Sequence, residues 1–219
     1  ALYSGINGIT VGSNGTAVTA SISDPDNASA FSHDIAVTSL ATAQVLAFPD
    51  FTSADQSIGT GTLSFTFGTW TGGSFTSNGT TNNVTISSGN GTLEGIAASI
   101  NDATIGVTAS IVKEKDDSYY LMLKSTEGAA NAMQISVTED NSGDSLDQLA
   151  YTSYDASREL VAAANAALTI DGVAVTRASN SVTDVIDGVT LTLNSTTSSA
   201  ETVSASFDTS TALTAAQGF

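Results

Sequence analysis

Apolar residues alternate with threonine or serine along most of this chain, and this period of two constrains the fold more than any other feature. Successive side chains of a β-strand point to opposite faces, so the pattern is typical of strands with one buried face. Threonine favours the pleated backbone while its hydroxyl faces water. The pattern recurs at residues 9–11, 18–22, 63–67, 84–86, 107–111, 135–137, 168–170, 173–175, 189–193 and 203–207. The sequence therefore predicts a mainly β protein.

Two Asp-Gly pairs mark turns between these predicted strands. Asp171 and Gly172 separate two alternating runs, which is the strongest short-range signal of a β-hairpin. Asp187 and Gly188 precede the run at 189–193 in the same way. Antiparallel pairing of neighbouring strands follows from such short connections.

A short helix interrupts the strand pattern after residue 90. Thr92 or Asn90 is suited to cap its start and Asn101 to end it. Gly95 inside it costs up to about 1 kcal/mol relative to alanine, so we expect the helix to form only when docked on a sheet. Its apolar face consists of residues spaced at i, i+3, i+4 and i+7: Leu93, Ile96, Ala97 and Ile100.

Two further segments favour helical structure. Residues 155–167 are rich in alanine, with Leu160, Val161 and Ala164 at helical spacing, which predicts a helix or helical connector. A single helical turn at 181–186, capped by Asn180 or Ser181, is also expected.

The polar, acidic segment at 139–147 is the best candidate for a domain boundary, and residues 24–27 form a second break. We expect residues 31–150 to form an inserted β-rich domain that carries the helix. Residues 1–30 and 151–219 then form a discontinuous second domain, because the early strands pair with the late hairpins. The predicted fold class is mainly β (α+β), with two small antiparallel domains and a helix packed on one sheet.

The charge excludes several partners. The chain has 22 acidic and 5 basic residues, a net charge of −17, so it repels nucleic-acid phosphates and anionic membrane surfaces. It has no cysteine, which removes thiolate chemistry, disulfides and cysteine-bound zinc. Neither a membrane-spanning run nor a signal peptide is evident.

No catalytic constellation stands out, and we expect no enzyme, cofactor or metal site. His33 is the single histidine, and we interpret it as a strand-edge histidine near a carboxylate, because Ser32 and Asp34 point to the opposite face from it. The acidic turns at 24–27 and 140–144 lack the ligand order of a calcium loop. Trp70 is expected in a loop or core rather than in a sugar subsite.

The segment 91–112, with Ile100 and Asn101, is similar to the "IN" motif of bacterial flagellar proteins. Residues 119–130 resemble the strand and turn that follow this motif, and residues 35–44 and 59–63 resemble the start of the same unit. Two later blocks resemble the flagellar filament cap family, also called hook-associated protein 2. They are residues 167–180, with Asp171, Gly172 and Asn180, and residues 182–193, with Asp187 and Gly188.

This resemblance implies the head of a cap protein, without the coiled-coil leg, and it places the discontinuous domain nearer that leg. It implies export through the flagellar secretion channel without a cleaved signal peptide, and a position at the tip of the bacterial flagellum. The expected partners are flagellin subunits and other copies of the chain in a ring. The work implied is ordered flagellin insertion during filament assembly, and the motif residues are structural. The contact faces are not identified.

Two alternatives stay open. The outer variable domain of a flagellin shares the "IN" motif, but it would not carry the blocks at 167–180 and 182–193. An extracellular adhesin or carbohydrate-binding module is suggested by threonine-rich strands and an acidic surface, and a cap head can adhere as well.

Overall fold

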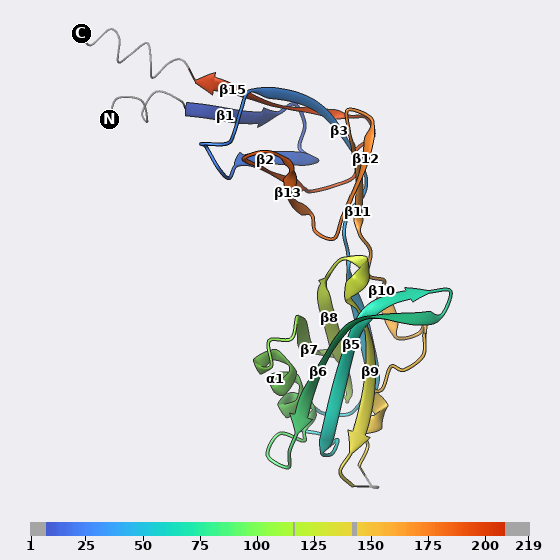
Figure 1. Ribbon diagram of the computed structural model, residues 1–219. Coiled ribbons are helices and arrows are strands. Elements are labelled where there is room, and N and C mark those ends of the chain that lie inside the picture. Colours follow the sequence, from blue (N-terminus) through green and yellow to red (C-terminus); the bar gives the residue numbers. More distant parts are fainter. Residues whose placement is uncertain (1–7, 116, 142–143, 209–219) are drawn as a thin grey trace, which may run out of the picture. The chain divides into compact units, whose positions relative to one another are not determined.

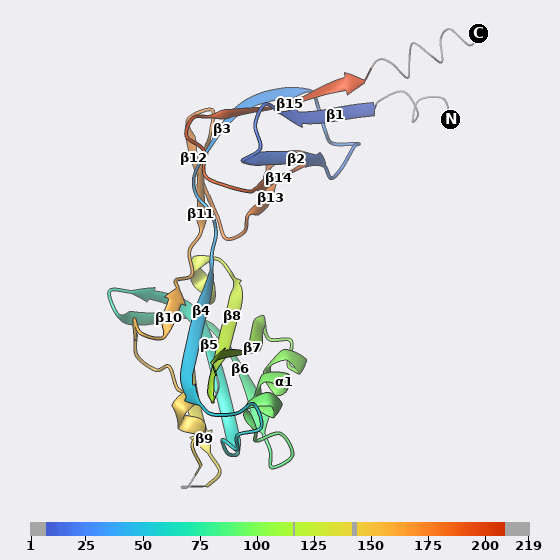
Figure 2. The same cartoon turned by 180° about the vertical axis from the view of Figure 1, so that it is seen from behind.

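The computed structural model describes residues 8–115, 117–141 and 144–208, and β-strands dominate it (Figures 1 and 2). All strand pairs among these residues are antiparallel, and one short α-helix is present, so the predicted mainly β fold class is confirmed. Expectations that concern residues 1–7, 142–143 and 209–219 lie outside the described residues.

The chain divides into two compact units, with the crossings at Ala41/Thr42 and Ala164/Asn165. The expected boundaries near 30 and 150 differ from these because strand pairing, rather than polar composition, sets them. β3 (Phe31–Ser39) pairs on both sides with strands of the discontinuous unit. Tyr151 bridges Ile135, and β10 (Glu159–Val161) pairs with β4 (Ala43–Phe51), so residues after 150 belong to the inserted unit.

The inserted unit contains two antiparallel sheets. One has the strand order β10-β4-β8-β7 and the other the order β6-β5-β9. The remaining strands are β5 (Gly61–Thr71), β6 (Ser74–Ile86), β7 (Val107–Lys115), β8 (Ser118–Glu127) and β9 (Ala132–Glu139).

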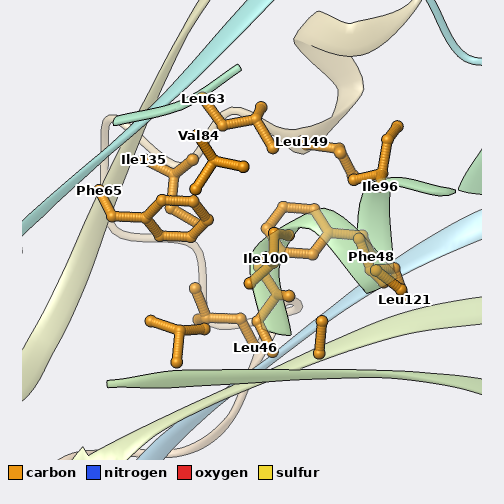
Figure 3. Close-up of a cluster of buried hydrophobic side chains, with 14 of the residues drawn as sticks. Leu46, Phe48, Leu63, Phe65, Val84, Ile96, Ile100, Leu121, Ile135 and Leu149 are labelled. Carbon is orange, nitrogen blue, oxygen red and sulfur yellow. The ribbon is translucent and has the colours of Figure 1, made fainter. Parts of the chain in front are cut away.

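Apolar side chains of both sheets form the core of the inserted unit (Figure 3). The alternation places Leu63 and Phe65 of β5 and Leu121 of β8 inside, each at most 1% exposed. Each such burial contributes about 1.5–3 kcal/mol. The spacing of two in the sequence therefore becomes a continuous core.

The helix α1 (Leu93–Asp102) closes this core from one side, contacting β6 and β7. Thr92 caps its start, because its side-chain oxygen accepts a hydrogen bond from the Gly95 N–H. Ile96 and Ile100 point toward Phe48 and its neighbours in Figure 3 and are fully buried. The predicted amphipathic helix and its apolar face are confirmed.

The helix predicted at 155–167 is wrong. Residues 155–158 form a turn, β10 follows, and β11 (Ala166–Ile170) begins a few residues later. Leu160 is 58% exposed, so the apolar residues at helical spacing share no buried face. Pairing of β10 with β4 and the bridge between Thr42 and Ala164 outweigh the helix propensity of alanine.

The described part of the discontinuous unit, residues 8–41 and 165–208, forms a five-stranded and a three-stranded sheet, with the orders β1-β15-β3-β11-β12 and β13-β14-β2. Their apolar faces enclose a separate core that includes Ile35, Leu191 and Val203. The other strands are β1 (Gly8–Ser13), β2 (Val18–Ile22), β12 (Val173–Arg177), β13 (Ser181–Ile186), β14 (Val189–Leu193) and β15 (Glu201–Asp208). The helical turn predicted at 181–186 is wrong, because this segment pairs with β14 as β13.

Candidate functional site

Asn101, in the last turn of α1, holds the helix to the outermost strand of its sheet. Its side-chain Nδ2 donates to the Ala109 carbonyl at 2.9 Å, and its Oδ1 accepts from the Ala109 N–H at 2.8 Å. β7 is paired on one side by β8 and is otherwise an edge strand. The amide of Asn101 thus takes the place of one residue of a neighbouring strand.

Asn180 makes the same arrangement in the discontinuous unit. Its Oδ1 accepts from the Ala41 N–H at 2.8 Å, and its Nδ2 donates to the Ala41 carbonyl at 2.9 Å. Its own carbonyl accepts from the Leu193 N–H. One asparagine therefore joins the end of β14 to the residues that follow β3.

Asp171 and Gly172 form the two-residue turn between β11 and β12, where Ile170 pairs with Val173. Both have positive φ, 49° and 83°, which suits an Asp-Gly hairpin turn. The Asp171 carboxylate accepts from the Asp34 N–H at 2.9 Å and contacts His33 Nδ1 at 2.6 Å. The pKa of Asp171 is lowered, first by the Asp34 hydrogen bond and then by that of His33.

His33 therefore has a carboxylate partner, although the partner comes from a distant hairpin. β3 lies between β15 and β11, so His33 is on an inner strand rather than at the edge of the sheet. Its ring stacks on Phe31 at a centroid distance of 5.3 Å. These contacts tie the β11–β12 turn to β3.

Asp187 and Gly188 connect β13 to β14, and here the glycine is required by a close approach. Gly188 has φ 71°, and its carbonyl accepts from the Ser23 and Asp24 N–H groups. A Cβ at this position would overlap the main chain of Asp24 and Ala28. The break at 24–27 is therefore packed against this turn.

One carboxylate in each acidic turn accepts hydrogen bonds from other groups of the protein. Asp24 accepts from the Asp26 N–H and from Asn27 Nδ2. Asp144 accepts from the N–H and hydroxyl of Thr60, and the first of these is the main cause of its lowered pKa. Residues 142–143 of the turn at 140–144 lie outside the described residues. Within residues 8–115, 117–141 and 144–208, no group of three or more His, Asp and Glu is placed to hold a metal.

Among these same residues, no helix is long and apolar enough to cross a membrane.

One surface of the inserted unit differs from the acidic, hydroxyl-rich remainder. The side of the β10-β4-β8-β7 sheet that faces away from the core presents an apolar surface, the outer face. Val112 is 46% exposed and Leu160 58%. The face surrounds a shallow hollow of about 740 Å³. We define it by Ala47, Pro49, Val112, Tyr120, Met122 and Leu160.

Charge on this sheet is nearly balanced when both faces are counted, while the charged residues that line the hollow are Asp50, Glu114, Asp155 and Arg158. Its four strands carry three basic and four acidic residues, whereas the whole chain carries −17. Arg158, just before β10, is fixed in place. It donates to the Gln148 and Ala150 carbonyls and lies over the Phe48 ring at 5.0 Å. An exposed apolar surface of this kind is typical of protein contact sites.

The outer face was not predicted from the sequence. The signal was the run Tyr119-Tyr120-Leu121-Met122-Leu123, which is apolar at consecutive positions and so on both faces of β8. A half-buried strand would show polar residues at 120 and 122.

Comparison with known proteins gives one consistent result. Residues 163–219 match the family model of the flagellar hook-associated protein 2 C-terminus, and residues 74–127 match that of the flagellin hook IN motif. The chain is 41% identical over 113 residues to flagellar hook-associated protein 2 of Salmonella typhimurium, which is 50% of this chain and 24% of that protein. It is 34% identical over 126 residues to the B-type flagellar hook-associated protein 2 of Pseudomonas aeruginosa, covering 52% and 27% of the two chains.

The solved structures extend the likeness to nearly the whole chain. The D2-D3 domains of the flagellar cap protein FliD from Escherichia coli superpose with a TM-score of 0.73 and 31% identity, covering 92% of this chain and 100% of that one. The chain belongs to the flagellar cap protein (FliD) family. A FliD structure with domains D1, D2 and D3 from the same organism gives a TM-score of 0.76 at 31% identity, over 97% of this chain and 60% of that one.

The chain therefore corresponds to part of a FliD protein, since its match spans only about a quarter of the Salmonella relative. Within it, the "IN" segment forms α1 and the edge it covers, and the C-terminal match includes β11 to β14.

Proposed function

We propose that this chain is the head of a flagellar filament cap, which sits on the tip of the bacterial flagellum and promotes ordered insertion of flagellin. The observation that carries the proposal is the superposition on the complete D2-D3 pair of a flagellar cap protein. The head acts by binding and conformational change, and no covalent bond is made or broken. Flagellin subunits and further copies of the same protein are its partners.

The pairing of β1 with β15 supports the proposed placement of the discontinuous unit nearer the helical leg. These adjacent antiparallel strands bring residues 8 and 208 opposite each other. Flanking segments of a longer protein would then leave the head side by side. Antiparallel helices of one leg can start from such a pair of ends.

We further propose that copies of the head meet through the outer face. Net charge opposes contact between identical chains of −17, but the four strands of this sheet together carry only one more acidic than basic residue. The exposed apolar side chains Val112 and Leu160 supply the area that contact would bury.

The test is deletion of the gene for the full-length protein in the source bacterium, followed by complementation. We expect the deletion strain to release unpolymerised flagellin into the medium and to carry short filaments or none. Plasmid-borne full-length protein restores them, and protein lacking residues 8–208 does not. Normal filaments and no free flagellin in the deletion strain would overturn the proposal.

A further inference from the structure

A hollow of about 520 Å³ lies in the inserted unit, beside the tip of the β5–β6 hairpin and the segment after β10. Its volume is within the range of about 300–1,000 Å³ typical of ligand pockets. Figures 1 and 2 both show the hairpin tip next to β10. The residues around it are Thr69, Trp70, Gly72, Gly73, Ala132, Tyr154, Glu159, Ala162 and Ala163.

Two aromatic rings, Trp70 and Tyr154, line this hollow at a centroid distance of 6.2 Å. Contacts with neighbouring residues of the inserted unit hold Trp70 in place. Its indole Nε1 donates to the Met133 carbonyl at 3.0 Å, and its ring contacts Phe75 and Tyr151. Tyr154 is 44% exposed. Contacts within the protein therefore position the rings, and the Tyr154 ring remains accessible to solvent.

Glu159 places a carboxylate beside the rings. Its Oε1 accepts from Gln44 Nε2 at 2.6 Å, and its charge is the main cause that raises the pKa of Tyr154. A carboxylate offers about four acceptor positions, so capacity for another donor is left. None of the residues that line the hollow is basic.

The other walls are small. Five of the nine lining residues are glycine or alanine, so those walls extend no further than a Cβ. Side-chain hydrogen-bonding groups come from Thr69, Trp70, Tyr154 and Glu159, and the Thr69 hydroxyl and the Trp70 indole already donate to the Ala129 and Met133 carbonyls. A neutral saccharide, which needs several hydrogen-bond partners, finds few here.

We propose that this hollow binds a lysine or arginine side chain of a partner protein. A cation is attracted to the faces of tryptophan and tyrosine rings, and Glu159 adds an opposite charge. The alanine walls match the methylene stem of such a side chain, which a small inorganic cation lacks. The inference rests on this geometry alone and does not require the proposed function.

Trp70 is the single tryptophan of the chain, so its fluorescence reports on the hollow directly. The test titrates the 219-residue chain with Nα-acetyl-arginine amide and Nα-acetyl-lysine amide. Nα-acetyl-citrulline amide serves as the neutral analogue, and N-acetylglucosamine represents saccharides. We expect a saturable change in Trp70 emission with the two cationic probes at millimolar concentrations, and at least about five-fold weaker binding of the neutral ones.

Glu159→Gln removes the charge but keeps an amide oxygen for Gln44, and we expect it to weaken cation binding about five-fold or more. Glu114→Gln, the same change on an exposed residue outside the hollow, serves as the matched control and should leave binding unaltered. If Glu159→Gln fails to fold, Ala162→Leu at an exposed position fills the hollow instead and should abolish binding. Equal binding of the citrulline and arginine probes, preference for the saccharide, or no saturable change would each overturn the proposal.

Discussion

The side-chain amide of Asn101 and the main chain of Ala109 exchange two hydrogen bonds, as two residues on neighbouring antiparallel strands do. Asn180 and Ala41 repeat this pairing in the other unit. An unpaired strand edge is open to association with other chains, and proteins usually cover or charge it. In this protein a single asparagine closes part of such an edge and fixes α1 on the core at the same time.

Replacing Asn101 by alanine removes both hydrogen bonds. We expect the free energy of unfolding to fall by about 1–2 kcal/mol, because the main-chain groups of the buried Ala109 lose their partner. Water can reach the exposed position 101, and this limits the loss. Urea denaturation of the chain measures the change. Asn83→Ala, at an exposed position of β6, is the matched control and should stay within about 0.5 kcal/mol of the original. If the two variants are equally stable, the asparagine pairing is not stabilising.

Gly95→Ala should destabilise the protein although it favours the helix. Alanine gains about 1 kcal/mol of helix propensity, but its Cβ would lie 2.5 Å from the Asn90 carbonyl oxygen and 2.8 Å from two other main-chain atoms of Asn90. Such overpacking costs about 1–3 kcal/mol. Thermal unfolding should therefore show a net loss, whereas Gly89→Ala, with open space around its Cβ, should be neutral or stabilising. An increase in stability for Gly95→Ala would show that the loop yields easily.

The period-two pattern predicted strands correctly at the ten segments where it occurs, and most of these have one buried and one exposed face, although β12, with Val173 66% exposed, does not. The helix α1 was equally clear, since Leu93, Ile96 and Ile100 need a 3.6-residue repeat to share one face. Both signals are local. The segment 155–167 failed because its alanines lack a dominant face, and pairing of Glu159 and Val161 with β4, more than 100 residues earlier, decided its structure.

Local sequence patterns did not predict most of the candidate functional surfaces. Asn101, Asn180, Asp171 and Gly188 were identified by resemblance and by turn chemistry, yet their partners Ala109, Ala41, Asp34 and Asp24 come from other elements. The hollow at Trp70 needs residues from three separate segments, so no spacing in the sequence indicates it. The apolar residues at 120 and 122 were the one indication of the outer face in the sequence.

Acid should weaken the anchoring of the β11–β12 turn. Hydrogen bonds from Asp34 and His33 lower the pKa of Asp171 below its ordinary value of 3.8. A carboxyl group with a lowered folded-state pKa stabilises the fold above its unfolded-state pKa, and this contribution is lost as the pH falls through the folded-state value. Asp171→Asn should therefore be less stable than the original chain at pH 7, and the difference should shrink below about pH 4. Urea denaturation of both chains at pH 7 and below about pH 4 tests this prediction. A difference in stability that does not change with pH would contradict it.

Association between heads should strengthen with salt. Each chain carries −17, so copies repel over a Debye length that falls from roughly 30 Å at 0.01 M to roughly 8 Å at 0.15 M. Few cations exist to form ion pairs that salt would weaken, since the chain has 5 basic residues. Light scattering between about 20 and 300 mM sodium chloride should show a rising mean mass. A constant or falling mass would mean that charge repulsion does not limit the contact.

At high salt, where repulsion is screened, Val112→Asp should reduce association through the outer face. Val112 is 46% exposed, so the substitution removes no core packing, and we expect thermal stability to change by less than about 0.5 kcal/mol. In a contact between copies, however, the carboxylate would be buried without a partner and oppose binding. Val173→Asp is the matched control, because Val173 is 66% exposed on β12 of the other unit and gains the same charge. Sedimentation equilibrium compares the two, and equal association would show that heads meet elsewhere.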